Sequence, residues 1–431
     1  MKYISTNRKS KSVTFREAVI KGIADDNGLF YPENLNPFSV EFIQELKQLS
    51  LSEIAFEIAR IFVHNDIPDR DLFEILTDTL NFDIPLVKVG NNVYSLELFH
   101  GPTLAFKDIG ARFLARCMGH FLENDDPVTV LVATSGDTGS AVANGFLRLK
   151  EANVVILYPS GKVSELQEKQ FTTLGHNITA LEVNGTFDDC QKMVKQAFSD
   201  QELNQKMKLS SANSINIARL IPQIFYYFYA YSQLESEIKP LIVSVPSGNY
   251  GNLTAGLLAK RLGLPIDVFI AASNINRPVP DYLVTGIFTP RPSRQTIANA
   301  MDVGNPGNFE RILLMFDHSW ETIKKEIKGY SYTDEQIRAV IYDVYHKTGY
   351  ILDPHGAIGY MALKEYMNSF DACGIFLETA HPAKFHSIIE EIIQTKINIP
   401  SRLLQCLEKE KKAILINNQF DDLKDFLFSK M

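Results

Sequence analysis

The chain has 431 residues, of which 45% are hydrophobic and 22% charged, so it can bury a substantial core and form more than one structural unit. Its 43 basic and 51 acidic residues give a net charge of −8, the wrong sign for a protein that binds nucleic acid through its phosphates. No uninterrupted apolar run approaches membrane-spanning length. We therefore expect a cytoplasmic protein with neither a nucleic acid nor a membrane as its partner.

Four cysteines occur in the chain, at positions 117, 190, 373 and 406. Their spacing fits no paired zinc-ligand motif. We expect them to be buried thiols in a reducing compartment, and we expect no bound metal.

The first 82 residues have a mostly helical pattern. Apolar residues recur every three or four positions over residues 40–48 and 51–63. The possible helix N-caps are Ser39 and Ser50 or Ser52. We predict a separate N-terminal segment, residues 1–82, that packs on the rest of the chain.

From residue 84 onward, short apolar runs alternate with turns and helical patterns. The predicted strands are residues 128–134, 153–158, 178–183, 241–245, 266–272 and 373–377. Nearly continuous apolar strands that alternate with helices indicate a parallel sheet buried on both faces. Residues 274–309 are rich in Pro, Gly and Asn, which predicts a loop-rich excursion at the surface or over a cleft.

Two loops combine glycine with hydroxyl or amide side chains directly after a predicted strand and before a predicted helix. They are Thr-Ser-Gly-Asp-Thr-Gly at 134–139 and Ser-Gly-Asn-Tyr-Gly-Asn at 247–252. Backbone N–H groups at a helix N-terminus bind anions, so each loop is a candidate phosphate or carboxylate site, although one such loop alone could be a simple helix cap. Neither G-x-x-x-x-G-K-[ST] nor a G-x-G-x-x-G after a strand is present.

Lys107 stands between an apolar pair, Leu104 and Phe106, and a predicted helix start. Partial removal from water favours the neutral amine, which is the form that makes a Schiff base. The alternative is a surface lysine whose stem covers a helix end.

Five segments carry a family resemblance. They are Pro102 to Asp108, residues 134–139, residues 211–219, residues 247–252 and the Glu-Thr-Ala-His-Pro stretch at 378–382. In this order they resemble the pyridoxal-phosphate enzymes of the tryptophan synthase β fold, and more closely the threonine synthases of the longer bacterial and fungal type. The resemblance implies a two-lobed parallel-sheet α/β fold (fold type II), with a first lobe at 83–235 and a second lobe with a helical C-terminus at 236–431.

The resemblance also implies the site. Lys107 would be the Schiff-base lysine of pyridoxal 5′-phosphate and would move protons between substrate carbons. The cofactor would further contact Gly248, Asn249, Tyr250, Gly251, Asn252 and Thr379. The substrate carboxylate would be bound by Ser135, Gly136, Asp137 and Thr138. The substrate phosphate would be bound by Asn213, Ser214 and Arg219.

Several positions depart from the wider fold or compete with these assignments. Relatives often carry Asn at position 137, where it contacts the 3′ oxygen of the cofactor; an ionised Asp cannot donate, so we do not assign that contact to Asp137. Many relatives also carry Arg at the position of Ile109. Arg112, one turn further along, would either take the place of that arginine or face solvent. Glu378 should point away from the ring if Thr379 meets it. We expect His381 and His386 to be structural.

The implied reaction converts O-phospho-L-homoserine and water into L-threonine and phosphate, through γ-elimination and addition of water to the β carbon. The N-terminal segment or the proline-rich region would help to close the site. The rival functions are a serine or threonine dehydratase, a sulfhydrylase, and a non-catalytic metabolite-binding relative. The sequence leaves both monomer and homodimer open.

Overall fold

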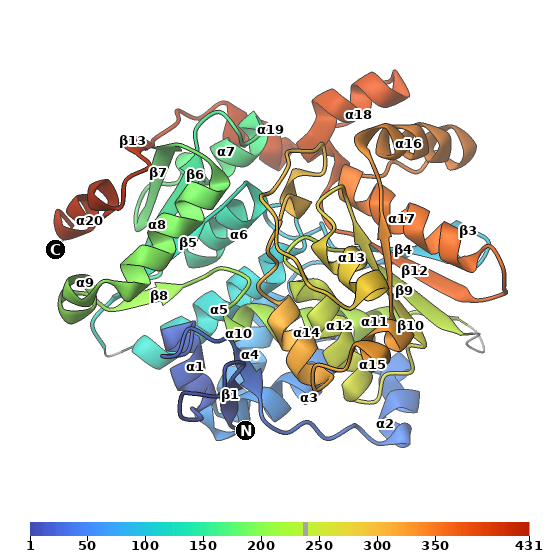
Figure 1. Ribbon diagram of the computed structural model, residues 1–431, viewed down its shortest axis with the longest axis horizontal. Coiled ribbons are helices and arrows are strands. Elements are labelled where there is room, and N and C mark those ends of the chain that lie inside the picture. Colours follow the sequence, from blue (N-terminus) through green and yellow to red (C-terminus); the bar gives the residue numbers. More distant parts are fainter. Residues whose placement is uncertain (124, 236–239, 431) are drawn as a thin grey trace.

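A computed structural model describes residues 1–123, 125–235 and 240–430. Two β-sheets, each surrounded by helices, form two α/β lobes, and the N-terminal segment runs beneath both (Figure 1). This arrangement confirms the predicted two-lobed α/β fold. None of the helices in the described part of the chain combines the length and apolarity that a membrane crossing needs.

The N-terminal segment is mostly helical, as predicted, but it also contains a short antiparallel ladder that the pattern did not reveal. Its elements are β1 (Tyr3–Ser5), α1 (Phe15–Lys21), β2 (Phe30–Pro32), α2 (Val40–Glu45), η1 (Leu46–Gln48), α3 (Leu51–Val63), η2 (His64–Asp66) and α4 (Asp69–Thr79). Ser39 and Ser50 are the N-caps of α2 and α3, and each accepts a hydrogen bond from the third residue of its helix. Phe15 packs against Phe113 and Phe121 of helix α5 (Lys107–Leu122), so the segment shares a core with the lobes.

The five-stranded sheet has the order β13-β7-β6-β5-β8, and every pair in it is parallel. Its strands are β5 (Val128–Ala133), β6 (Ala152–Pro159), β7 (Ile178–Asn184), β8 (Leu209–Ser211) and β13 (Ile414–Asn417). The helices in this part of the molecule are α5 (Lys107–Leu122), α6 (Asp137–Phe146), α7 (Glu165–Thr172), α8 (Phe187–Ser199), α9 (Gln201–Lys206), α19 (Ser401–Leu407) and α20 (Phe420–Phe428).

The six-stranded sheet has the order β11-β10-β9-β12-β4-β3 and is parallel except for the β3–β4 hairpin. Its strands are β3 (Leu86–Gly90), β4 (Val93–Glu97), β9 (Leu241–Pro246), β10 (Val268–Ser273), β11 (Ile327–Ser331) and β12 (Cys373–Glu378). Its helices are α10 (Ile217–Leu220), α11 (Gln223–Ser232), α12 (Gly251–Arg261), α13 (Pro278–Thr285), η3 (Asn299–Met301), α14 (Phe309–Met315), α15 (Trp320–Glu326), α16 (Asp334–Thr348), α17 (Pro354–Met367), η4 (Pro382–Phe385) and α18 (His386–Ile393).

Sheet membership crosses the predicted division between residues 235 and 236. Strands β3 and β4 precede it but lie in the six-stranded sheet, and β13 follows it but lies in the five-stranded sheet. The division of the chain into units 1–82, 83–235 and 236–431 therefore stays a prediction about folding units, and it does not describe the sheets.

The proline-rich region is only partly a loop. Pro278 is the first residue of α13. Proline is favourable at this position because a backbone N–H there would have no acceptor within the helix. The rest of the region includes the short helix η3, which borders the cavity described below. The cysteines also differ in part from expectation, because Cys117 and Cys190 are buried whereas Cys373 and Cys406 are only half-buried.

Candidate active site

One cavity lies at the carboxyl ends of strands β5, β9 and β12, where both lobes contribute loops. It brings together twelve of the fourteen predicted site residues. They are Lys107, Ser135, Thr138, Asn213, Ser214, Arg219, Gly248, Asn249, Tyr250, Gly251, Asn252 and Thr379. Within the described ranges, no group of His, Cys, Asp or Glu side chains is arranged to hold a metal ion.

Lys107 is the first residue of α5, and backbone pairing fixes it beside Thr379. The Phe106 N–H donates to the carbonyl of Thr379 at 2.9 Å, and the His381 N–H donates to the carbonyl of Leu104 at 3.0 Å. Leu104 adopts a left-handed conformation, with φ of 59°, to make this connection. The amine and the Thr379 hydroxyl therefore line the same cavity although they are far apart in sequence.

The amine of Lys107 is poised for reaction. Burial lowers its pKa to about 8; Asp137 opposes this shift, and Arg219 and Lys384 add to it. Near neutral pH the neutral, nucleophilic amine is therefore much more populated than in an exposed lysine.

The 247–252 loop, at the start of α12, has the geometry of an anion cradle. Tyr250 adopts a left-handed conformation, with φ of 61°, which turns the chain into the helix. A Cβ on Gly248 would lie 2.7 Å from the Ala300 carbonyl oxygen and 2.8 Å from Met301 Cα, so only glycine fits there. Asn252 is buried, and its Nδ2 has no partner among the described residues. The loop thus offers helix N–H groups and an unused buried donor to an anionic ligand.

A second set of groups that could bind an anion borders this loop. The Asn249 amide donates to the Ser214 hydroxyl at 2.6 Å. Arg219 is 2% exposed and donates to the Ala212 carbonyl, while its Nε lacks a partner within the described part of the chain. Burial lowers the pKa of Arg219 to about 10, so it remains a cation at neutral pH. A buried, incompletely partnered guanidinium is suited to a phosphate.

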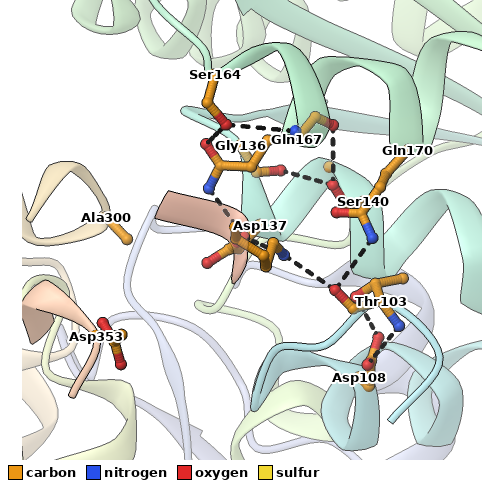
Figure 2. Close-up of polar contacts among 12 residues, drawn as sticks. Thr103, Asp108, Gly136, Asp137, Ser140, Ser164, Gln167, Gln170, Ala300 and Asp353 are labelled. Carbon is orange, nitrogen blue, oxygen red and sulfur yellow. Dashed lines mark hydrogen bonds and ion pairs between the residues drawn. The ribbon is translucent and has the colours of Figure 1, made fainter. Parts of the chain in front are cut away.

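Gly136 and Asp137 are the two predicted residues that do not line the cavity. Gly136 has φ of 141°, and a Cβ on it would lie 2.6 Å from Cδ of Gln167. The Asp137 carboxylate instead forms a buried ion pair with Lys384, at 2.5 Å. It also accepts a hydrogen bond from Gln167 Nε2 at 2.9 Å (Figure 2). Burial would raise the pKa of Asp137, but Lys384, Lys107 and Gln167 outweigh it and hold the pKa well below its ordinary value.

Lys384 links this carboxylate to the loop that carries Lys107. It is 1% exposed, and its ammonium also donates to the carbonyl of Thr103 at 3.0 Å. Thr103 in turn donates its N–H and hydroxyl to Asp108, at 2.8 and 2.6 Å (Figure 2). Sequence reasoning missed Lys384 and Gln167, because no local pattern shows which buried charge pairs with which.

The expectation for Arg112 was wrong, whereas those for Glu378 and His381 agree with the structure. Arg112 neither replaces a site arginine nor faces solvent; it is 8% exposed and donates to the carbonyls of Thr79 and Asp78 at the end of α4. Glu378 points away from the cavity, as alternation along a strand requires, and lies fully buried behind it. His381 caps η4, where its Nδ1 accepts from the Ala383 N–H at 3.0 Å.

Comparisons with known proteins agree with this geometry. Residues 79–372 match the family described as pyridoxal-phosphate dependent enzyme, residues 2–80 match the threonine synthase N terminus, and residues 356–427 match the threonine synthase C-terminal family. The fold and the site thus define a pyridoxal-phosphate-dependent enzyme of fold type II. Within that class, the chain belongs to the threonine synthase family.

Individual relatives cover nearly the whole chain. Threonine synthase from Haemophilus influenzae is 44% identical over 98% of this chain and 97% of its own length. The crystal structure of threonine synthase from Escherichia coli has a TM-score of 0.95 at 42% identity and covers both chains fully. The pyridoxal-phosphate-bound threonine synthase from Brucella melitensis has a TM-score of 0.93 at 34% identity, over 99% of this chain and 98% of its own.

The residues of the cavity fit pyridoxal phosphate. The aldehyde of this cofactor needs an amine of lowered pKa, which is Lys107. Its phosphate needs a glycine-rich helix N-terminus, and the 247–252 loop provides one with the unpartnered Asn252 amide.

Proposed function

We propose that this cavity converts O-phospho-L-homoserine and water into L-threonine and phosphate, as a carbon–oxygen lyase acting on phosphates. One observation carries the proposal: a buried amine shares the cavity with two adjoining anion-binding groups, the 247–252 loop and the Asn213, Ser214 and Arg219 set. A cofactor phosphate and a substrate phosphate need two such sites. A dehydratase or a sulfhydrylase would need only the first.

Each group has a separate task in this proposal. Pyridoxal phosphate supplies, when bound, an electron sink that stabilises negative charge on the substrate carbons. The 247–252 loop would hold its phosphate, and the Thr379 hydroxyl would be the partner of its ring nitrogen. Lys107 would hold the cofactor, and its Nζ would accept and return protons during the reaction.

The substrate is held at its two ends. Arg219, Asn213 and Ser214 bind its phosphate and balance the charge that leaves with it. Ser135 and Thr138 bind its carboxylate with hydroxyl and backbone donors at the start of α6. Gly136 and Asp137 contribute only through their backbone, since Lys384 and Gln167 already occupy the carboxylate of Asp137.

The purified protein is tested with O-phosphohomoserine by following phosphate release and threonine formation together. Wild-type protein should form both products in equal amounts, and Lys107→Ala should form neither. Deamination of free serine or threonine without action on phosphohomoserine would replace the proposal with a dehydratase.

Arg219→Met separates the two anion sites. We expect KM for phosphohomoserine to rise by about tenfold or more, because a charge-assisted contact is lost, while the dissociation constant of the cofactor stays unchanged. Loss of cofactor binding instead would mean that the two phosphate sites are assigned the wrong way round.

We further propose that the enzyme acts in the cytoplasm as a monomer or homodimer. The buried thiols of Cys117 and Cys190 support a reducing compartment. Sedimentation of the purified protein distinguishes the two assembly states.

A further inference from the structure

A histidine that sequence reasoning missed lies in the wall of the cavity. His355, near the start of α17, is 2% exposed and lines the cavity with Lys107 and Thr379. Asp353 is the N-cap of α17 and accepts from the His355 N–H at 2.7 Å, which places the ring next to the carboxylate.

Two contacts define the orientation and the tautomer of the ring. The Ala300 N–H donates to Nε2 of His355 at 3.3 Å. A backbone N–H can only donate, so Nε2 carries no hydrogen and Nδ1 does. Nδ1 therefore donates to Oδ1 of Asp353, at 2.5 Å. Figure 2 shows Ala300 and Asp353 together on one side of the site.

A second carboxyl group supports Asp353 from behind. Glu378 is fully buried, and its Oε2 accepts from the Asp353 N–H at 3.4 Å. Burial, followed by the charge of Asp353, raises the pKa of Glu378 well above its ordinary value, which favours the neutral acid. Burial would also raise the pKa of Asp353, but His355 and Glu378 outweigh it and lower the pKa. Asp353 is thus an ionised carboxylate between two hydrogen-bonding partners.

The free end of this chain of contacts touches the anion cradle. Ala300 belongs to the short helix η3, which packs so tightly on Gly248 that no Cβ fits between them. Anchoring the Ala300 N–H therefore fixes the wall against which the 247–252 loop rests.

We propose that His355 is a positioning residue for the cofactor phosphate: through Nε2 it anchors η3 against Gly248 and so holds the 247–252 loop in its anion-binding shape, while Asp353 and Glu378 fix the ring. This inference rests on the proposed function, because it assumes that the loop binds the phosphate of pyridoxal phosphate.

The test compares two ligands on the apoprotein, pyridoxal phosphate and pyridoxal, whose dissociation constants are measured by absorbance titration. His355→Leu fills the space but removes the acceptor and leaves the Ala300 N–H unpaired. We expect pyridoxal phosphate to bind about tenfold more weakly or worse, which corresponds to about 1.4 kcal/mol, and pyridoxal to bind within about twofold of wild type.

His355→Gln is the matched control, because an amide can accept from Ala300 and donate to Asp353 in the same place. It should restore most of the affinity for pyridoxal phosphate. Thermal unfolding of each apoprotein reports whether a variant is merely destabilised.

Equal weakening of both ligands, unchanged affinity for pyridoxal phosphate in His355→Leu, or failure of His355→Gln to recover would each overturn the inference. A wild-type protein that binds neither ligand would overturn the proposed function instead, so the two failures are distinguishable.

Discussion

Charges of both signs act on the amine of Lys107 through space, and together with burial they set its pKa. Burial brings its pKa to about 8, and the Asp137 carboxylate opposes that shift. Removing the carboxylate in Asp137→Asn should therefore move the pKa of Lys107 further down. Competitive acylation of the apoprotein at different pH values, followed by peptide mass spectrometry, measures this pKa against the exposed lysines. An inflection near the ordinary value of about 10.4 would contradict the expectation.

The same pKa shift makes stability depend on pH. Between pH 8 and about 10.4 the unfolded chain holds a proton on Lys107 that the folded chain has lost. The contribution of Lys107 to the free energy of unfolding of the apoprotein therefore rises with pH across this window. Lys107→Met should remove that contribution, which urea unfolding at several pH values would detect as a shallower slope.

The Asp137–Lys384 pair is buried at both ends, with 4% and 1% of each residue exposed. Lys384→Met leaves Asp137 with less compensation for its burial, so we expect the free energy of unfolding to fall by about 3–5 kcal/mol. Asp137→Asn combined with Lys384→Met removes both charges and should regain most of this loss. Urea unfolding of the apoproteins measures both effects, and a double variant no more stable than the single one would contradict this account.

What could be predicted at the residue scale follows from chemistry that is local in sequence. Lys107 and the two glycine loops were predicted because each lies in a recognisable stretch. Lys384 and His355 could not be predicted, because their partners Asp137 and Ala300 meet them only in the folded chain. The dependence of Asp137 on a buried cation likewise has no signature in the 134–139 loop.

At the scale of elements, the start of α6 depends on Gly136. In Gly136→Ala the residue must keep φ of 141° and its Cβ would lie 2.6 Å from Gln167. Backbone strain alone costs about 1–3 kcal/mol, and we expect the free energy of unfolding to fall by more than this. Gly161→Ala is the control: Gly161 also has positive φ, 67°, but nothing lies within 4 Å of its Cβ. Urea unfolding should show the larger loss for Gly136→Ala, and equal losses would exclude crowding by Gln167.

The strands that could be predicted are those with continuous apolar runs, such as β5, β6 and β9, because both of their faces are buried. The strands that the pattern missed are short or lie at sheet edges, such as β8, β11 and β13, where half-exposed positions admit polar residues. The pairing of β4 with β12, which places Val93 opposite Gly374, joins segments far apart in the chain and has no local signal at all.

At the scale of the whole molecule, the N-terminal segment and the lobes should unfold together. Phe15 of α1 is 1% exposed and contacts α5, the helix that begins with Lys107. Phe15→Ala should lower the free energy of unfolding by about 3–5 kcal/mol. The single tryptophan, Trp320, lies in α15 in the other lobe. The unfolding transitions of Phe15→Ala followed by its fluorescence and by far-ultraviolet circular dichroism should therefore coincide.

Phe73→Ala is the matched control, because this ring is 42% exposed, and it should cost less than about 1 kcal/mol. Separate transitions by the two probes in Phe15→Ala would show that the N-terminal segment unfolds on its own.

The position of β13 has a consequence for how the protein is made. β7 ends at Asn184, but the strand that covers its edge begins only at Ile414. At roughly 5–20 residues per second, a ribosome needs on the order of 10–50 s to synthesise the intervening chain. During that time the nascent polypeptide presents an uncovered strand edge, which is a template for pairing with other chains. The β7 edge is therefore where a chaperone would protect the growing chain, and a premature stop before Ile414 would leave it open permanently.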